Sequence, residues 1–237
     1  MRPITATFLA CAALSGSALV TADEKKAEPS NRARVTKFLD DHVIGKTVGS
    51  PKTTSKRDEG RMEADYEDQT TFNNFASTAQ GMRFDVTTVS KETRYELSKD
   101  GKRLLPGRDL SGTEVYRYEL CERASTKQLT GTARLLSMTT KVPSREGAVL
   151  LVTGVKVEGG KLSWNETLPG YLDLVTTKGK YKPGSWDSTS TFSLAGGKLR
   201  VEYDVTNFDV NPDTLKRTPT KDKFPTFSAK EIQEPAR

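Results

Sequence analysis

Between residues 46 and 210, hydrophobic residues fall mainly at every second position of the chain. The clearest case is residues 199–206, in which apolar and polar side chains alternate without a break. Because the side chains of a β-strand point to its two faces in turn, this pattern indicates strands with one dry face and one wet face. Similar alternation occurs in Met82–Val86, Tyr116–Leu120, Leu162–Trp164 and Phe192–Leu194. We therefore predict an all-β domain built mainly of antiparallel strands.

Short glycine-containing segments separate several of these runs. They are Asp100-Gly101, Gly159-Gly160 and Gly196-Gly197. Such residues tolerate the positive φ that two-residue hairpin loops need. Consecutive hairpins make sequence neighbours into sheet neighbours, so we predict a meander of about eight to ten strands. Residues 148–152 are apolar at every position, which predicts a central strand covered on both faces.

Before the strands, the hydrophobic period changes to that of a helix. One face of this helix is formed by Val35, Phe38, Leu39 and His42. Ser30 or Asn31 can cap its start, and Gly45 can end it in a left-handed turn. His42 is the only histidine of the chain. Because it lies on the apolar stripe, we favour a packing role for it over a catalytic one.

A short N-terminal helix followed by an antiparallel meander resembles the calycin or lipocalin type of up-and-down β-barrel. The resemblance is one of layout and covers roughly residues 32–210. The Gly-x-Trp motif that opens those barrels is not found after the helix, where Gly45-Lys46-Thr47 stands, and Gly184-Ser185-Trp186 comes much later. We therefore predict a lipocalin-like barrel as an architecture, with a β-sandwich as the alternative.

The N-terminus carries the only long apolar stretch of the chain. Residues 4–22 follow Arg2 and end in Val20-Thr21-Ala22, a small-residue exit typical of a secretory signal peptide. We divide the chain into a signal peptide (1–22), a flexible leader (23–31), one β domain (32–210) and a polar C-terminal tail (211–237). We expect export to the periplasm or the cell exterior after cleavage near Ala22, and no transmembrane segment in the mature chain.

The charged residues argue against a nucleic-acid partner. The chain has 37 basic and 31 acidic residues, with a net charge of +6. The two signs are interleaved throughout, whereas a nucleic-acid binder gathers its basic residues into a stripe or block. We therefore predict no nucleic-acid binding.

The two cysteines give no internal disulfide. Cys11 falls in the predicted signal peptide, where we do not expect lipidation, and Cys121 is left alone in the mature chain. Cys121 sits in a strand-like run, so we predict a buried and inert thiol. With one histidine and one cysteine, the mature chain also cannot build a zinc site from several such ligands.

Aromatic residues concentrated in the β region are the main candidates for a binding site. If the strands close into a barrel, some of them would face a cavity and bind an apolar or amphipathic ligand, whereas in an ordinary core they would only fill space. The candidate ligand-binding residues are Tyr116, Tyr118, Trp164, Trp186 and Tyr203. A weaker calcium candidate is Asp209, Asn211 and Asp213, which match the alternating oxygen ligands in the first half of a calcium loop.

Three classes of function follow from these patterns. We favour an exported, non-enzymatic binding protein that holds a small apolar or amphipathic ligand and needs no cofactor. The first alternative is an envelope or extracellular module that binds a protein or glycan through a sheet face. The second is a hydrolase of unrecognised type that uses a pair of carboxylates. No nucleophile elbow or Ser-x-x-Lys pair occurs in the sequence.

Overall fold

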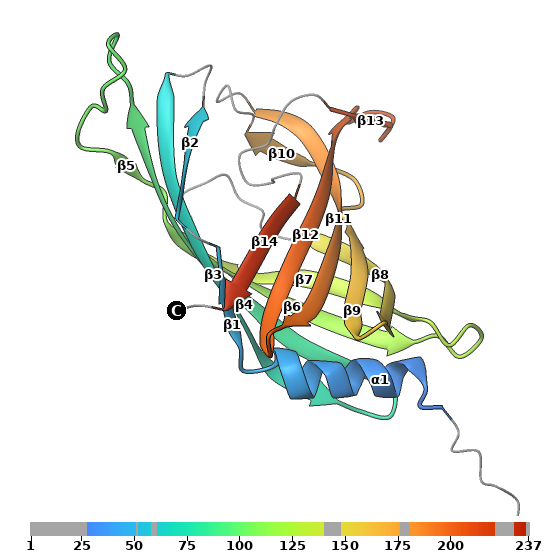
Figure 1. Ribbon diagram of the computed structural model, residues 1–237. Helices are drawn as coiled ribbons and strands as arrows, with labels where there is room; N and C mark the ends of the chain where they lie inside the picture. The colour runs from blue at the N-terminus through green and yellow to red at the C-terminus, as the bar shows by residue number, and fades with distance from the viewer. Residues whose placement is uncertain are drawn as a thin grey trace, which may run out of the picture.

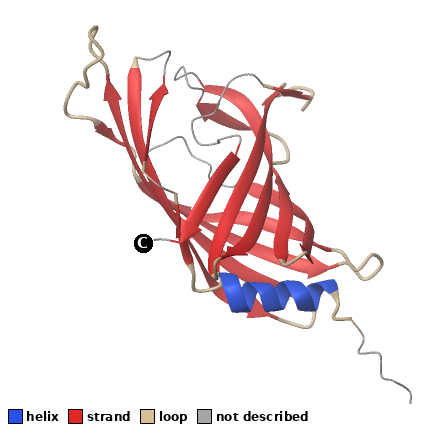
Figure 2. Ribbon diagram, in the orientation of Figure 1, coloured by secondary structure: helices blue, strands red, loops and turns tan. Residues whose placement is uncertain are grey.

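The computed structural model describes residues 28–50, 52–57, 61–139, 148–175, 181–220 and 230–235. In these residues the chain is almost entirely antiparallel β-structure with one short helix (Figure 2). This confirms the predicted all-β class. The predicted signal peptide (1–22) and most of the leader (23–31) lie outside the described residues.

The helical segment and the strands have the following bounds. The helix α1 spans Asn31–Phe38 and continues as one π-helical turn, η1, over Leu39–Val43. The strands are β1 Thr47–Gly49, β2 Thr53–Arg57, β3 Met62–Ser77, β4 Gly81–Glu96, β5 Arg108–Asp109, β6 Gly112–Glu122, β7 Leu129–Met138, β8 Val149–Glu158, β9 Lys161–Thr167, β10 Leu172–Val175, β11 Tyr181–Ala195, β12 Lys198–Val210, β13 Arg217–Pro219 and β14 Lys230–Pro235.

The long strands follow the up-and-down order that the turn residues predict. Strands β3, β4, β6, β7, β8, β9, β11 and β12 are hydrogen-bonded neighbours in sequence order, all antiparallel. The short strands β1 and β14 connect β3 with β12 through a few residue pairs. The result is a single curled sheet (Figure 1), not the two stacked sheets of a sandwich.

Two of the predicted hairpin turns have the expected backbone. Gly159 and Gly160 between β8 and β9 have φ of 54° and 72°, and Gly196 and Gly197 between β11 and β12 have 57° and 77°. Both residues of a type I′ turn need positive φ, which glycine adopts without steric cost. The turns pair Glu158 with Lys161 and Ala195 with Lys198, and so start the β8–β9 and β11–β12 hairpins in register.

The helix lies across one end of the curled sheet (Figure 1). The Ser30 hydroxyl accepts a hydrogen bond from the Ala33 backbone N–H, and the Asn31 amide donates to the Val155 carbonyl of β8 at 2.8 Å. Within the described residues, no helix is long and apolar enough to cross a membrane.

The apolar face of the helix differs from the predicted one at its last position. Val35, Phe38 and Leu39 are buried as expected, but the fourth buried residue is Val43, and His42 is half-buried at the edge of the Phe38 ring. The π-turn accounts for this difference, because the Ile44 N–H bonds to the Leu39 carbonyl five residues back. The wider turn rotates Val43 onto the covered face in place of His42.

The hydrophobic core fills the concave side of the sheet next to the helix. It is formed by side chains from nearly every long strand together with the apolar face of α1 and η1. The largest fully buried members are Phe72, Phe84, Phe192, Leu39, Leu120, Leu129 and Leu162. Burying such side chains contributes about 2 kcal/mol each, so this end of the sheet is closed by packing.

Two predictions of burial are wrong, and the single sheet explains both. In the apolar run 148–152, Leu150 and Val152 are buried but Leu151 is exposed. Cys121, predicted to be buried, is also exposed, and it has no disulfide partner. A curled single sheet covers only its concave face, so alternate residues of even an apolar strand lie on the convex surface.

The sheet continues beyond the predicted end of the β domain at residue 210. Strand β13 pairs with β12, and β14 inserts between β12 and β1. Two segments of the predicted polar tail (211–237) therefore belong to the sheet. Phe224 and Phe227 of that tail lie outside the described residues.

Candidate functional site

A buried carboxyl group lies on the concave face of the sheet, among aromatic side chains. Leu162, Trp164 and Glu166 occupy alternate positions of β9 and point to the same side. Glu166 is only 7% exposed. A buried carboxylate carries a large desolvation cost unless its oxygens are hydrogen-bonded, so its contacts decide what it does.

Three side chains from three strands donate hydrogen bonds to Glu166. The Tyr118 hydroxyl of β6 lies 2.8 Å from Oε1, and the Trp164 indole N–H lies 2.6 Å from the same oxygen. The Ser188 hydroxyl of β11 lies 3.2 Å from Oε2. All three donors are neutral, and together they leave at least one lone pair of Oε2 available. We refer to Glu166, Tyr118, Trp164 and Ser188 as the Glu166 cluster.

Burial governs the protonation of this cluster. It raises the pKa of Glu166 above its ordinary value, against the opposing effect of the hydrogen bonds from Trp164, Tyr118 and Ser188. Burial, followed by the nearby Glu166 charge, also raises the pKa of the Tyr118 hydroxyl well above its usual range. The phenol therefore stays protonated and acts as a donor, while Glu166 favours its neutral form more than an exposed glutamate does.

Stacked aromatic rings hold the cluster in place. The Tyr118 ring stacks on Phe84 with centroids 4.8 Å apart and an interplanar angle of 6°. The Trp164 ring lies 4.5 Å from Phe192, which in turn makes an edge contact with Phe72 at 5.6 Å. Rings packed in this way have few alternative rotamers. The donors are therefore fixed toward Glu166 by the same core that closes the helix end.

The Ser190 hydroxyl is a second buried polar group beside the cluster, and unlike Glu166 it has no hydrogen-bond partner among the described residues. Ser190 lies in β11, between its strand partners Trp164 of β9 and Tyr203 of β12. It is the next inward-facing residue of β11 after Ser188. Its residue is fully buried, and its hydroxyl has no partner among the described residues. A buried hydroxyl without a partner costs about 1–3 kcal/mol, which is unusual in a core that serves packing alone.

The structure places the five predicted ligand-binding residues in and around this cluster. Tyr118 and Trp164 contact Glu166 directly. Tyr116 and Tyr203 are partly buried against the same core, and their proximity contributes to the raised pKa of Tyr118. Trp186 is buried in the core as well. The five residues thus share one face of the sheet.

The calcium candidate forms a turn at the end of β12. The Asn211 side-chain oxygen accepts hydrogen bonds from the backbone N–H groups of Asp213 and Thr214, at 2.9 and 3.0 Å. Asp209 forms an ion pair with Lys182 at 2.6 Å. These contacts are those of a turn after a strand. In the described part of the chain, no three His, Cys, Asp or Glu residues gather as a metal site.

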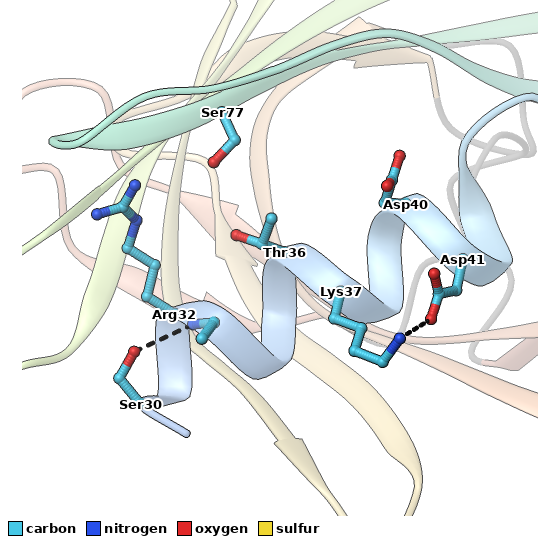
Figure 3. Close-up of a pocket in the computed structure, with 8 residues that line it drawn as sticks. Ser30, Arg32, Thr36, Lys37, Asp40, Asp41 and Ser77 are labelled. Carbon is cyan, nitrogen blue, oxygen red and sulfur yellow. Dashed lines mark hydrogen bonds and ion pairs between the residues drawn. The ribbon is translucent and has the colours of Figure 1, made fainter. Parts of the chain in front are cut away.

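A separate pocket of about 480 Å³ lies between α1 and the end of β3 (Figure 3). Its lining is polar and carries both signs of charge: Ser30, Arg32, Ala33, Thr36, Lys37, Asp40, Asp41 and Ser77. Lys37 and Asp41 form an i, i+4 ion pair at 2.6 Å along the helix surface. The pocket contains no member of the Glu166 cluster, and its paired surface charges are typical of a solvated helix face.

Glu166, Ser188 and Ser190 were not predicted as site residues from the sequence. Glu166 follows Asn165 in β9, and Asn165 is exposed on the other face of the strand. The available signal was the alternation Leu162, Trp164, Glu166, which places a carboxyl group where a dry side chain is expected. Ser188 and Ser190 share the inward positions of β11 with Trp186 and Phe192 in the same way.

Comparison of the chain with family models, with curated proteins and with solved structures finds no match. The geometry of the concave face therefore carries the functional argument.

Proposed function

We propose that this chain is an exported, non-catalytic binding protein with a lipocalin-like barrel, and that it holds a small amphipathic ligand against the concave face of its sheet. The ligand's apolar part lies along the partly buried aromatic side chains Tyr116 and Tyr203, and its polar end lies at Glu166. The predicted N-terminal signal peptide supports the exported location.

The observation that carries this proposal is the polar lining of an otherwise aromatic concave face. A core that only stabilises the fold satisfies its polar groups internally or excludes them. Here Ser190 keeps an unpartnered hydroxyl next to a carboxyl group that is slightly exposed and still has acceptor capacity. Binding sites for small ligands combine apolar walls with a few convergent polar groups in this way.

The chemistry of the cluster favours a ligand whose polar end donates hydrogen bonds. The neutral donors Tyr118, Trp164 and Ser188 are already directed at Glu166. The lone pair that remains on Oε2 of Glu166 can accept a hydrogen bond from a ligand. A cationic donor such as an ammonium group would also lower the pKa of Glu166. An anionic head group would be repelled by the Glu166 carboxylate, because no cation of the cluster lies between them.

Tryptophan fluorescence provides a direct test, because the chain has only two tryptophans and one of them, Trp164, donates to Glu166. The mature protein is titrated below the micellar concentration with dodecylamine and, separately, with dodecanoic acid. We expect a saturable change in emission with dodecylamine and an affinity at least about tenfold lower for dodecanoic acid.

Two conservative variants make the result specific. Glu166→Gln keeps the shape of the site but removes its charge, and we expect it to weaken dodecylamine binding about tenfold. Asp85→Asn changes a buried carboxyl group on the convex face and should leave binding unchanged. The proposal is wrong if neither amphiphile gives a saturable signal, or if Asp85→Asn weakens binding as much as Glu166→Gln.

A further inference from the structure

The end of the sheet opposite α1 carries three leucines with largely exposed side chains. Leu105 is 79% exposed and Leu104 is 48% exposed, and both lie in the connection between β4 and β5. Leu215, 56% exposed, lies in the turn between β12 and β13. Figure 1 shows both connections at the end of the molecule away from the helix. We call these two segments, residues 97–107 and 211–216, the open rim.

The β4–β5 connection is held in place by specific contacts. Arg103 forms ion pairs with Glu63 at 2.7 Å and with Asp65 at 2.8 Å, and its guanidinium lies 4.4 Å from the centre of the Tyr95 ring. The Leu104 N–H donates to the Glu96 carbonyl at 2.8 Å. These contacts anchor the residue before the two leucines to the sheet. The two exposed leucine side chains therefore follow directly on an anchored stretch of backbone.

Basic residues surround the exposed leucines. Residues 97–108 contain four basic residues, of which Lys102 pairs with Asp100 at 3.2 Å and Arg103 with Glu63 and Asp65, while Lys99 and Arg108 stand beside them. Lys99 and Arg108 are exposed, and in the other connection both Lys216, next to Leu215, and Asp213 are exposed. Apolar side chains flanked by lysine and arginine bind the boundary between head groups and acyl chains, where the cations meet anionic lipid.

We propose that the open rim docks on an anionic lipid surface, with Leu104 and Leu105 inserted below the head groups. A projecting tip with two leucines fits a fluid interface, which closes around an inserted side chain. A stable protein interface instead needs about 800 Å² of complementary surface on each partner, whereas the rim offers two leucines on one connection and one on the other. Rim docking would also bring the concave face close to the membrane.

Vesicle sedimentation tests this proposal without reference to any bound ligand. The mature protein is mixed with vesicles of phosphatidylcholine plus phosphatidylglycerol, or of phosphatidylcholine alone. We expect binding to the anionic vesicles only, and weaker binding as salt is raised from about 0.1 M, because salt screens the rim cations. Leu104→Asp combined with Leu105→Asp should lower the bound fraction about tenfold or more.

Two further variants make the outcome decisive. Lys99→Gln combined with Arg108→Gln should lower binding severalfold while leaving the Arg103 anchor intact. Leu194→Asp changes an exposed leucine near the β11–β12 turn and should bind as the unchanged protein does. Circular dichroism verifies that each variant is folded. The proposal is overturned if anionic vesicles bind no protein, if neutral vesicles bind equally well, or if the Leu104/Leu105 variant retains full binding.

Discussion

Two buried carboxyl groups on opposite faces of the same sheet have opposite environments. Asp85 of β4, 3% exposed, faces the convex side, where Arg117 of β6 bonds it at 2.8 and 3.0 Å and Asn74 donates at 2.8 Å. The Arg117 hydrogen bonds hold the pKa of Asp85 below its ordinary value. Glu166 on the concave side is bonded by neutral donors, and its burial raises its pKa.

This difference separates a structural pair from a candidate binding group. The charge of Asp85 is compensated by a cation that the chain itself supplies, so its environment is complete. Glu166 receives hydrogen bonds without a compensating charge, and Ser190 next to it keeps an unpartnered hydroxyl. The convex carboxyl group stabilises the sheet, whereas the concave one is suited to an external donor.

The largest expected effect comes from removing the acceptor at the concave site. Glu166→Leu leaves the indole N–H of Trp164 and the hydroxyls of Tyr118 and Ser188 buried without their partner. We expect the free energy of unfolding in urea at neutral pH to fall by about 3 kcal/mol. Glu166→Gln, which keeps an acceptor oxygen, is the matched control and should lose much less. Equal losses in the two variants would mean that the hydrogen bonds contribute little.

A somewhat smaller loss is expected on the convex face. Arg117→Gln leaves the buried Asp85 with Asn74 as its remaining side-chain donor. Because Arg117 is itself partly exposed to water, we expect a loss of about 2 kcal/mol, less than for a fully buried pair. Adding Asp85→Asn to this variant should restore part of the stability by removing the uncompensated charge. A double variant less stable than Arg117→Gln alone would contradict this interpretation.

Removing a single donor should have a still smaller effect. Tyr118→Phe deletes the 2.8 Å hydrogen bond to Glu166 but keeps the ring stacked on Phe84. We expect the free energy of unfolding to fall by about 1 kcal/mol, measured by urea denaturation. Tyr203→Phe changes a tyrosine of the nearby strand β12 and provides a comparison. The account is contradicted if Tyr118→Phe is as damaging as Glu166→Leu.

The smallest expected effect is on the pH dependence of stability, and its sign differs between the two carboxyl groups. Because the pKa of Glu166 is raised in the folded state, its contribution to stability should decline as pH rises above its ordinary value of 4.5. The pKa of Asp85 is lowered, so its contribution is present above its ordinary value of 3.8 and is lost as pH falls through the folded pKa.

Urea midpoints measured from acid to neutral pH for the unchanged protein, Glu166→Gln and Asp85→Asn isolate these two contributions. Subtracting the Glu166→Gln curve should leave a difference that falls with rising pH, and subtracting the Asp85→Asn curve should leave one that rises. Two differences that change in the same direction with pH would show that the environments of the two groups are alike.

Local patterns predicted the order of the strands better than they predicted the faces of those strands. Alternation and the glycine pairs at 159–160 and 196–197 depend on neighbouring residues, and they correctly indicated an antiparallel meander. The exposure of Leu151 and Cys121 depends on whether a second layer covers the sheet, which neighbouring residues do not encode. The burial of Val43 in place of His42 depends on a π-turn that no residue pattern predicted.

The candidate site was only half predictable for a similar reason. Tyr118 and Trp164 could be selected because aromatic residues are rare and sit in clear strands. Glu166 and Ser190 are common residue types, and their significance arises from partners on β6, β11 and β12 that are distant in sequence. A carboxyl group in the dry register of a strand is the signal that would have identified Glu166.

The central claim is that the concave face binds a small molecule, and native mass spectrometry of the mature protein purified from its natural host tests it most directly. The account predicts a protein mass with an additional small molecule that is lost on denaturation, and that is absent or reduced when Glu166→Gln is purified in the same way. The mass of the bare chain under both native and denaturing conditions would contradict it.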